Sequence, residues 1–172
     1  MRVVSGELGG RKLVSPEGTS TRPTTDRARE AVFNALGSAG VLDGAIVADL
    51  FAGTGAVGIE AISRGAAHCT FVERDRNALR ALEENVDTLD LADRTRIVRS
   101  DAMQAAVTLD VDIVFADPPY DFDGWEQFLA NVRADFVVAE SGRALKEQTG
   151  WTTTRSKRYG RAWVSFLERN AE

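Results

Sequence analysis

The strongest constraint on the fold is a repeated alternation between short apolar runs and segments with helical spacing. The apolar runs have the length of strands buried on both faces, and they occupy residues 46–51, 70–73, 95–99, 111–116 and 136–140. Residues 57–64, 79–89 and 125–132 have the pattern of helices. This alternation predicts an α/β fold with a mostly parallel central sheet, right-handed crossovers and helices on both faces.

Both ends of the chain predict additional β-structure. Residues 2–6 and 11–14 have the pattern of two short strands around a glycine-rich turn, which indicates a hairpin. Residues 151–154 and 162–167 predict two antiparallel strands that pair through a turn at residues 157–160. The C-terminal pair would therefore extend the parallel sheet with antiparallel strands.

A helix is predicted ahead of the first buried strand. It runs from Asp26 to Leu36 with apolar residues at helical spacing, and Gly37 is expected to end it. No internal repeat or linker interrupts the chain. We expect a single domain at residues 31–172 that carries a small N-terminal extension at residues 1–30.

The composition fits one globular domain. The 172 residues are 44% hydrophobic and 27% charged, and no apolar run approaches the roughly 20 residues of a membrane span. No signal-peptide pattern opens the chain. The single cysteine, Cys69, excludes an internal disulfide, so a cytoplasmic location is expected. We expect Cys69 and the single histidine, His68, to be packing residues and no metal site to be present.

The charges are unevenly distributed along the chain. The formal net charge is −5, which by itself argues against a nucleic-acid partner. Residues 1–30 hold six Lys or Arg and four Asp or Glu, residues 140–172 hold seven and four, and residues 31–139 hold eight and eighteen. The two ends would form a basic face for nucleic acid if they fold together. Scattered solvated charges are the alternative.

A glycine-rich loop follows the first buried strand, with Gly53, Gly55 and Gly58. Glycines at these positions let the backbone approach a ligand, and the third lets the next helix pack against the sheet. Glu73 ends the second strand 20 positions after Gly53 and can accept hydrogen bonds from both hydroxyls of a ribose. A dinucleotide and S-adenosylmethionine both fit this pattern.

Two acidic positions favour S-adenosylmethionine over a dinucleotide. Asp49 stands just before the loop, where a carboxylate would repel a pyrophosphate and attract an ammonium and a sulfonium. The third strand ends at Asp101, which could accept the adenine amino group while a backbone N–H binds a ring nitrogen. The predicted cofactor-binding residues are Asp49, Phe51, Ala52, Gly53, Gly55, Glu73, Arg74, Asp101 and Ala102.

The tetrad Asp117-Pro118-Pro119-Tyr120 follows the fourth apolar run. The prolines lack N–H groups and hold the turn open, so Asp117 and the backbone carbonyls present only acceptors. A planar amino group fits such a site, because its two hydrogens need acceptors while its nitrogen attacks. Tyr120 offers a face on which the ring carrying this amino group can stack. The alternative is a plain loop in which the tyrosine packs into the core.

The combined motifs resemble a known family. The tetrad is similar to the [Asn/Asp/Ser]-Pro-Pro-[Tyr/Phe/Trp] motif of class I S-adenosylmethionine-dependent methyltransferases that act on exocyclic amino groups. Residues 2–6, 10–13, 22–30 and 33–34 resemble the N-terminal signature of the RsmD family. The segment at 22–30 is far more specific than the tetrad.

The resemblance implies the Rossmann-like class I methyltransferase fold and methylation of the 2-amino group of one guanine in bacterial 16S ribosomal RNA. S-adenosylmethionine is then the donor and S-adenosylhomocysteine the product. Asp117 and the Pro118 carbonyl are expected to accept the two amino hydrogens, and Tyr120 to hold a base turned out of its stack. We expect a monomer that acts on the small ribosomal subunit or an assembly intermediate.

The N-terminal extension supplies most of the predicted RNA contacts. The predicted substrate-binding residues are Arg11, Lys12, Arg22, Thr24, Arg27, Arg29 and Pro119. The basic side chains would contact phosphates, which position RNA without reading its bases. A solvated helix face is the alternative for Arg27 and Arg29, and Thr24 could instead close over the methionine end of the cofactor.

Three other functions stay open. A DNA or other RNA amino-methyltransferase acting on adenine or cytosine shares the tetrad, although 172 residues leave little room for a separate target-recognition domain. A nicotinamide-dependent oxidoreductase fits the glycine-rich loop but leaves the tetrad unexplained. A cofactor-binding protein without catalysis differs from the methyltransferase only in activity.

Overall fold

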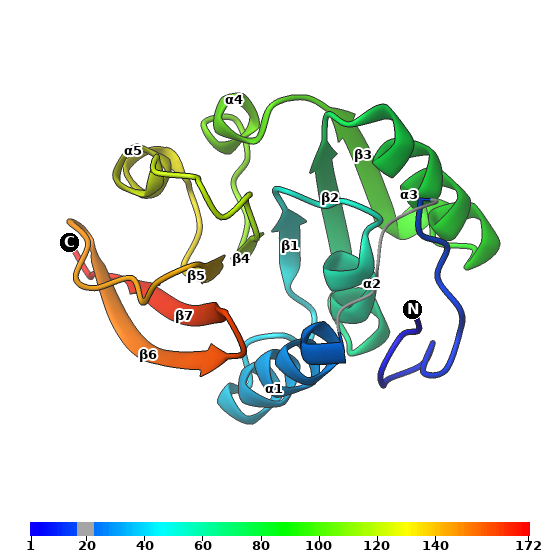
Figure 1. Cartoon of the computed structure of the whole chain (residues 1–172), viewed down its shortest axis with the longest axis horizontal. Helices are drawn as coiled ribbons and strands as arrows, with labels where there is room; N and C mark the ends of the chain where they lie inside the picture. Colours follow the sequence, from blue (N-terminus) through cyan, green and yellow to red (C-terminus); the bar gives the residue numbers. More distant parts are fainter. Residues whose placement is uncertain (17–22) are drawn as a thin grey trace.

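The computed structural model describes residues 1–16 and 23–172, with side chains described at 1–16 and 26–172. One sheet contains seven strands: β1 (Ile46–Asp49), β2 (His68–Glu73), β3 (Thr95–Arg99), β4 (Ile113–Ala116), β5 (Phe136–Ser141), β6 (Trp151–Tyr159) and β7 (Ala162–Arg169). Their order across the sheet is β3-β2-β1-β4-β5-β7-β6 (Figure 1). Strands β1 to β5 are parallel, whereas β7 is antiparallel to β5 and β6 is antiparallel to β7. The predicted sheet is confirmed.

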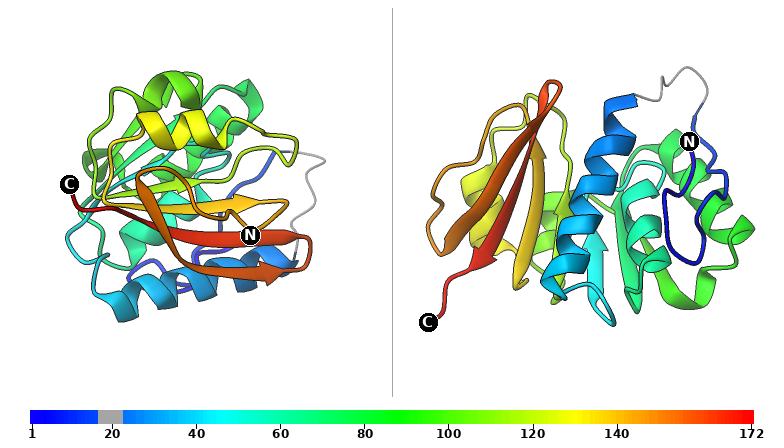
Figure 2. Two further views of the ribbon diagram at one scale, coloured as in Figure 1. Left: turned by 90° about the vertical axis from the view of Figure 1, so that its left-hand side faces the viewer. Right: turned by 90° about the horizontal axis from the view of Figure 1, so that it is seen from below.

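Helices cover both faces of the sheet, as predicted. They are α1 (Pro23–Ala39), α2 (Ala56–Ser63), α3 (Arg76–Thr88), α4 (Ala102–Ala106) and α5 (Trp125–Asn131), with a 3₁₀ turn at Ala92–Arg94. In Figure 2, left, α5 lies above the sheet and α1 below it. No helix in the described part of the chain is long and apolar enough to span a membrane.

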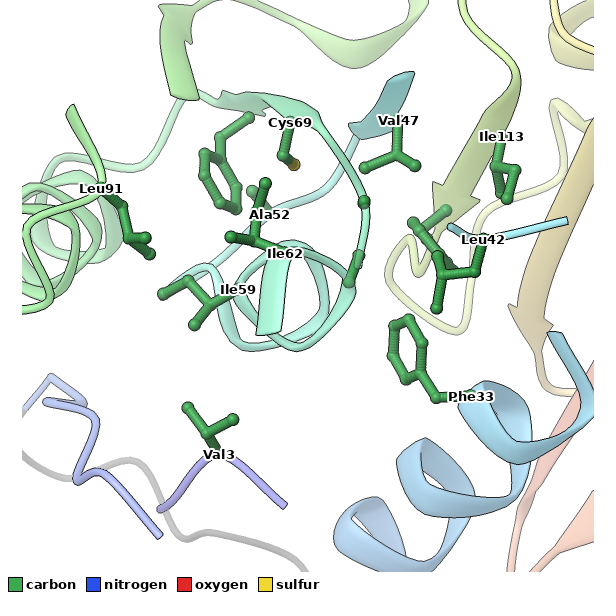
Figure 3. Close-up of a cluster of buried hydrophobic side chains, with 14 of the residues drawn as sticks. Val3, Phe33, Leu42, Val47, Ala52, Ile59, Ile62, Cys69, Leu91 and Ile113 are labelled. Atoms are coloured by element: carbon green, nitrogen blue, oxygen red, sulfur yellow. The ribbon is translucent and has the colours of Figure 1, made fainter. Parts of the chain in front are cut away.

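Two hydrophobic clusters fill the spaces on either side of the sheet. Successive residues of a strand point to opposite faces, so Val47 of β1 belongs to the cluster on the α1 side and Ala48 to the cluster on the α5 side. Figure 3 shows the first cluster, in which Val47 and Cys69 lie near Ile62 of α2. Cys69 is fully buried, as expected of a packing residue.

Helix α1 extends beyond its predicted end. It continues through Gly37 to Ala39, and the chain leaves the helix at Gly40, whose φ of 70° is left-handed. A glycine within a helix costs only about 1 kcal/mol relative to alanine. This cost is small, so Gly37 does not have to end the helix.

The C-terminal hairpin is also longer than predicted. Strand β6 continues to Tyr159 instead of ending at Thr154, and the turn lies at residues 160–161 instead of 157–160. The exposed side chains of this edge strand lack the apolar alternation on which strand prediction depends. Helix α4 was not predicted either, because five residues are too few to show helical periodicity.

Within the described residues, the predicted N-terminal hairpin forms only one bridge instead of two short strands, and it is fixed to α2. The Val3 N–H donates to the Arg11 carbonyl at 2.9 Å, and Arg2 pairs with Lys12. The fully buried carboxylate of Glu60 accepts hydrogen bonds from the N–H groups of Val4 (2.8 Å) and Ser5 (3.1 Å). The division into an extension at 1–30 and a domain at 31–172 stays a prediction, and α1 crosses that boundary.

Candidate active site

The candidate site is a cavity of about 950 Å³ at the carboxyl ends of β1 to β4. Ligands of open parallel sheets bind at this edge, where the strand order reverses. The order here reverses between β1 and β4, which are neighbours in the sheet but not in the sequence. Ten predicted site residues line the cavity: Phe51, Gly53, Glu73, Arg74, Asp101, Ala102, Asp117, Pro118, Pro119 and Tyr120.

Glycine is required at two positions of the loop that leads from β1 into α2. Gly55 caps α2 with a φ of 86°, a left-handed conformation that residues with a Cβ avoid. A Cβ added to Gly58 would lie 2.4 Å from a ring carbon of Phe71 and 2.6 Å from Cys69 Sγ, so only glycine lets α2 pack this closely on β2. Gly55 and Ala52 shape the loop without lining the cavity.

Glu73 ends β2 and holds the glycine-rich loop in place. One carboxylate oxygen accepts a hydrogen bond from the Gly53 N–H at 2.7 Å, and the other accepts from the N–H groups of Arg74 (2.8 Å) and Asp75 (3.0 Å). A carboxylate has about four lone-pair sites, so about one site of Glu73 remains to accept a hydrogen bond from the cavity. Its place at the cavity wall fits the predicted contact with ribose hydroxyls.

Asp101 follows β3 and caps α4. Its Oδ1 accepts hydrogen bonds from the N–H groups of Met103 (2.8 Å) and Gln104 (3.3 Å), and its Oδ2 lies 3.3 Å from Arg74 Nη1. The Arg74 side chain is 76% exposed, so this ion pair contributes little and can open. The N–H of Ala102 lies in the first turn of α4, where it has no partner within the helix.

The tetrad lies directly after β4. Asp117 is exposed, Pro118 is buried and Tyr120 keeps 49% of its surface accessible. The Pro119 carbonyl accepts a hydrogen bond from the Phe122 N–H at 2.9 Å, which closes the turn. Within the described residues, no hydrogen bond ends on the Pro118 carbonyl. A carboxylate, a carbonyl and an aromatic ring thus meet the cavity from nearly consecutive residues.

An aromatic wall of the cavity was missed in the sequence. The Phe122 ring packs edge-on against Phe51, with centroids 5.7 Å apart, and against Trp125 at 5.2 Å. Phe51 and Phe122 both line the cavity, where they offer apolar surface to a heteroaromatic ring. The sequence does show an aromatic residue two positions after the tetrad, but its role becomes visible only in the fold, where β1 places Phe51 beside it.

The charges of the cavity are almost all negative. Its described lining contains one guanidinium, that of Arg74, and six carboxylates, those of Glu73, Asp75, Asp101, Asp117, Asp121 and Glu140. A pyrophosphate would meet this negative field at short range, whereas a sulfonium or an ammonium would be attracted. The cavity therefore suits a cationic ligand better than a dinucleotide.

Comparison with known proteins identifies the family. The family model described as conserved hypothetical protein 95 matches residues 1–168. YlbH of Bacillus subtilis, named as an rRNA methyltransferase, is 39% identical over 184 residues, which cover 98% of this chain and 99% of that protein. Ribosomal RNA small subunit methyltransferase D of Escherichia coli is 36% identical over 187 residues, which cover 100% of this chain and 91% of the relative. This chain belongs to the RsmD family.

A solved structure agrees with this assignment. The structure of yhhF from Escherichia coli, named as a methyltransferase, matches with a TM-score of 0.87 and 36% identity over 100% of this chain and 99% of that one. The fold of this RsmD family member is that of the class I methyltransferases.

Asp49 hydrogen-bonds within the protein and does not line the cavity. Its side chain is buried, and Oδ2 accepts a hydrogen bond from the Gly58 N–H at 3.1 Å. Burial raises the pKa of Asp49 to about 7; the Gly58 hydrogen bond lowers it, and the negative charge of Glu73 raises it. The structure corrects the expectation of direct contact with a cationic ligand, because this carboxylate supports the loop from below the cavity.

The prediction that Arg29 contacts phosphate is wrong for this member of the RsmD family. Arg29 is 4% exposed, donates a hydrogen bond to the Arg2 carbonyl at 2.6 Å and lies 3.1 Å from Asp26. Its Nε lies 3.8 Å from the buried carboxylate of Glu60, which also pairs with Arg64. A buried carboxylate needs cationic partners, and Arg29 supplies one from a distant part of the sequence.

Among the other predicted RNA contacts whose side chains are described, Pro119 lines the cavity, whereas Arg11, Lys12 and Arg27 do not. Arg11 and Lys12 are exposed, but Arg11 donates to the Thr88 carbonyl at 3.3 Å. Because α3 begins beside the cavity and Thr88 is its last residue, Arg11 lies roughly 18 Å along the helix from it. Arg27 is exposed near the start of α1. Arg22 and the side chain of Thr24 lie outside the described residues.

Proposed function

We propose that the protein transfers a methyl group from S-adenosylmethionine to the exocyclic 2-amino group of a guanine in 16S ribosomal RNA. The observation that carries this proposal is the acceptor pair of Asp117 and the Pro118 carbonyl at an acidic cavity. The names of the relatives support a ribosomal RNA substrate, and one of them names the small subunit. The choice of guanine rests on the resemblance of the N-terminal segment to the RsmD family.

The cavity offers a place for each part of the donor. Glu73 can accept a hydrogen bond from the ribose, and Asp101 with the Ala102 N–H can bind the edge of adenine. Phe51 and Phe122 provide apolar surface for the ring. The carboxylates attract the positive charge of the donor. This attraction is lost with the neutral sulfur of S-adenosylhomocysteine, which favours product release.

The tetrad activates a weakly nucleophilic nitrogen. When bound, S-adenosylmethionine supplies a methyl group activated by a sulfonium. The 2-amino nitrogen of guanine is a weak nucleophile because its lone pair is delocalised into the ring. Asp117 accepts one amino hydrogen and the Pro118 carbonyl accepts the other, which draws the nitrogen towards tetrahedral geometry and frees the lone pair for in-line attack. Asp117 or water takes the proton after transfer.

Tyr120 and the acidic cavity together select a base that has left its helix. The accessible ring of Tyr120 can stack on guanine, with Pro119 beside it. A base is uncharged whereas each phosphate is negative, so the carboxylates admit the base and keep the RNA backbone outside. Turning out a base costs a few kcal/mol, which stacking and the two hydrogen bonds offset.

The N-terminal extension contributes further RNA contacts in this proposal. Arg11, Lys12 and Arg27 are exposed and can contact phosphates, which position the RNA without reading sequence. The protein acts as a monomer on the small subunit or on an assembly intermediate.

The test is methylation of small ribosomal subunits, assembly intermediates and free 16S RNA isolated from cells that lack the protein. With labelled S-adenosylmethionine, the protein should modify one nucleotide that mass spectrometry identifies as N2-methylguanosine, and Asp117→Ala protein should modify it at least about 100-fold more slowly. A methylated adenine or cytosine would contradict the choice of guanine. No labelling of any of the three substrates would refute the activity.

A further inference from the structure

We infer that the protein has a second RNA-contact surface, the hairpin tip, formed by residues 157–161 at the end of β6 and in the turn to β7. The hairpin tip carries Lys157, Arg158 and Arg161. Its occupant is the sugar-phosphate backbone of the RNA strand that flanks the target base. This inference rests on the proposed function, because it takes the substrate to be RNA.

The sheet places the hairpin tip at the same edge as the tetrad. Because β7 is antiparallel to β5 and β6 is antiparallel to β7, β6 ends and β7 begins at the carboxyl ends of the parallel strands. Lys157 pairs with Val164, which also pairs with Glu140 of the cavity lining. Figure 2, left, shows the hairpin tip, the loop after β4 and the start of α1 together on the right-hand side.

The distance between the tetrad and the hairpin tip matches a short stretch of RNA. The strand order β4-β5-β7-β6 separates them by three inter-strand steps of about 4.8 Å, which gives a backbone separation of about 14 Å. A stacked strand advances by about 3.4 Å per nucleotide along its helix axis, and successive phosphates lie farther apart than this, so a few nucleotides span the separation. A strand whose base enters the cavity can therefore lay its neighbouring phosphates on the hairpin tip.

The cations of the hairpin tip are exposed and lack carboxylate partners. None of Lys157, Arg158 and Arg161 forms an ion pair within the described residues, whereas five arginines elsewhere do. Arg158 Nε donates to the Gly160 carbonyl at 2.8 Å, and Lys157 Nζ lies 5.4 Å from the centre of the Tyr159 ring. These contacts orient two of the cations without neutralising them.

A second cavity lies beside the tetrad and extends to residues 141–143 at the end of β5. It has a volume of about 330 Å³, and its lining includes Tyr120, Ser141 and the exposed Arg143. Ser141 pairs with Trp163 of β7, which pairs with Arg158 of β6. Arg143 also has no ion pair within the described residues. Arg143, just after β5, thus places a cation between the tetrad and the tip in the strand order, and Asp123 lines the same cavity.

RNA needs such a surface because the main cavity repels its backbone. Six carboxylates line that cavity, and the exposed Arg11 is held at the far end of α3. The hairpin tip is the basic surface that the sheet register brings to the edge of the tetrad. It supplies the backbone affinity that an uncharged base alone does not provide.

The test compares two variants with equal charge. The tip variant carries Lys157→Gln, Arg158→Gln and Arg161→Gln. The control variant carries Arg80→Gln, Arg96→Gln and Arg133→Gln, which replace three exposed arginines without ion pairs in the described chain. Each set removes three positive charges, so the general attraction between protein and RNA falls equally in both.

Affinity for an unmodified 16S RNA transcript and for unmodified small subunits is measured between about 50 and 200 mM KCl. The tip variant should lower the slope of log affinity against log salt by about 2 to 3, as expected for three lost phosphate contacts, and weaken binding at least about tenfold. Its affinity for S-adenosylmethionine and its kcat at saturating RNA should stay within about twofold of wild type. The control variant should keep the wild-type slope.

A tip variant with the wild-type slope overturns the inference, and so does a control variant that loses as much affinity. Unchanged RNA binding together with lost binding to phosphatidylserine vesicles would also overturn it and assign the tip to a membrane surface. Failure of the proposed function has a separate signature. Wild-type protein that binds RNA through the tip but methylates no base would refute the activity and retain the surface.

Discussion

Two regions at the same edge of the sheet have opposite charge. In the described chain, the main cavity gathers six carboxylates around one arginine, whereas the hairpin tip carries three cations and no carboxylate. Three strand spacings separate the tetrad from the hairpin tip, and two separate Glu140 from Lys157. The Debye length is about 8 Å at physiological salt, so salt weakens the interaction between charges about 10 to 14 Å apart and each region keeps its own local charge. The net charge of −5 therefore describes neither region and predicts no partner.

The largest effect is expected from the tetrad, within the acidic region. Asp117→Ala should lower kcat by about 100-fold to 1,000-fold, the usual loss for one positioned hydrogen-bond partner, while donor affinity changes only a few fold. Asp121→Ala is the matched control, because it removes another exposed carboxylate from the same cavity. Steady-state kinetics should show little change in the control. Equal losses in both variants would replace the acceptor role with a general effect of charge.

The next largest effect is expected on stability, from the buried carboxylate of Asp49 beneath the acidic cavity. The pKa of Asp49 is about 7 in the folded protein against an ordinary 3.8, so the folded state binds this proton more tightly than the unfolded state. The resulting stability is fully present below about pH 4 and is lost as the pH rises through 7. When the pH rises from 5 to 8, the free energy of unfolding of the wild type should fall by about 2–3 kcal/mol more than that of Asp49→Asn, which cannot titrate at this position.

Urea unfolding of both proteins at the two pH values measures this difference. The amide side chain introduced by Asp49→Asn keeps an oxygen that can accept from the Gly58 N–H, so the variant should stay folded. An identical fall in both proteins would show that other groups cause the pH dependence.

A smaller effect is expected from Glu73. Glu73→Ala should weaken S-adenosylmethionine binding by about 1.5–3 kcal/mol, the loss typical of a charged hydrogen-bond partner. Calorimetric titration measures the affinity, and Asp121→Ala again controls for the loss of one cavity charge. Thermal unfolding of the Glu73 variant separates ligand contact from the loop support that Glu73 gives to the Gly53 N–H. An unchanged dissociation constant would remove Glu73 from the donor site.

The smallest effect should come from the N-terminal hairpin. Arg11→Ala with Lys12→Ala should lower the salt slope of RNA binding by at most about 1, because Arg11 is held at the far end of α3. The same RNA titration used for the hairpin tip measures this slope. A loss larger than that of the tip variant would move the RNA surface to the N-terminal hairpin and break the comparison between the two regions.

Much of the fold and most of the cavity-lining residues named in the sequence analysis could be predicted, because the sequence signals for them lie in adjacent residues. Glycine at positions 55 and 58 and proline at 118 and 119 impose backbone properties that no neighbour has to supply. The gathering of Glu73, Asp101 and Asp117 followed from one rule, that the carboxyl ends of parallel strands meet at one edge.

The errors have the opposite origin. Arg29 has the sequence context of an exposed helix residue, yet it is buried and lies beside the buried carboxylate of Glu60. Asp49 was assigned to the ligand, yet its partner is the Gly58 N–H. Phe122 gains its role from Phe51, which lies far from it along the chain. Each of these roles depends on a partner that sequence spacing does not reveal.

The sequence by itself determined the alternating α/β pattern, the glycine-rich loop and the acceptor-only tetrad, because each depends on the chemistry of adjacent residues. Only the tertiary structure decided which charges share a surface. Strand order and register bring Lys157 into line with Glu140, and burial withdraws Arg29 from solvent. Electrostatic interaction depends on separation in space and on exposure to water, and neither quantity is contained in the order of the residues.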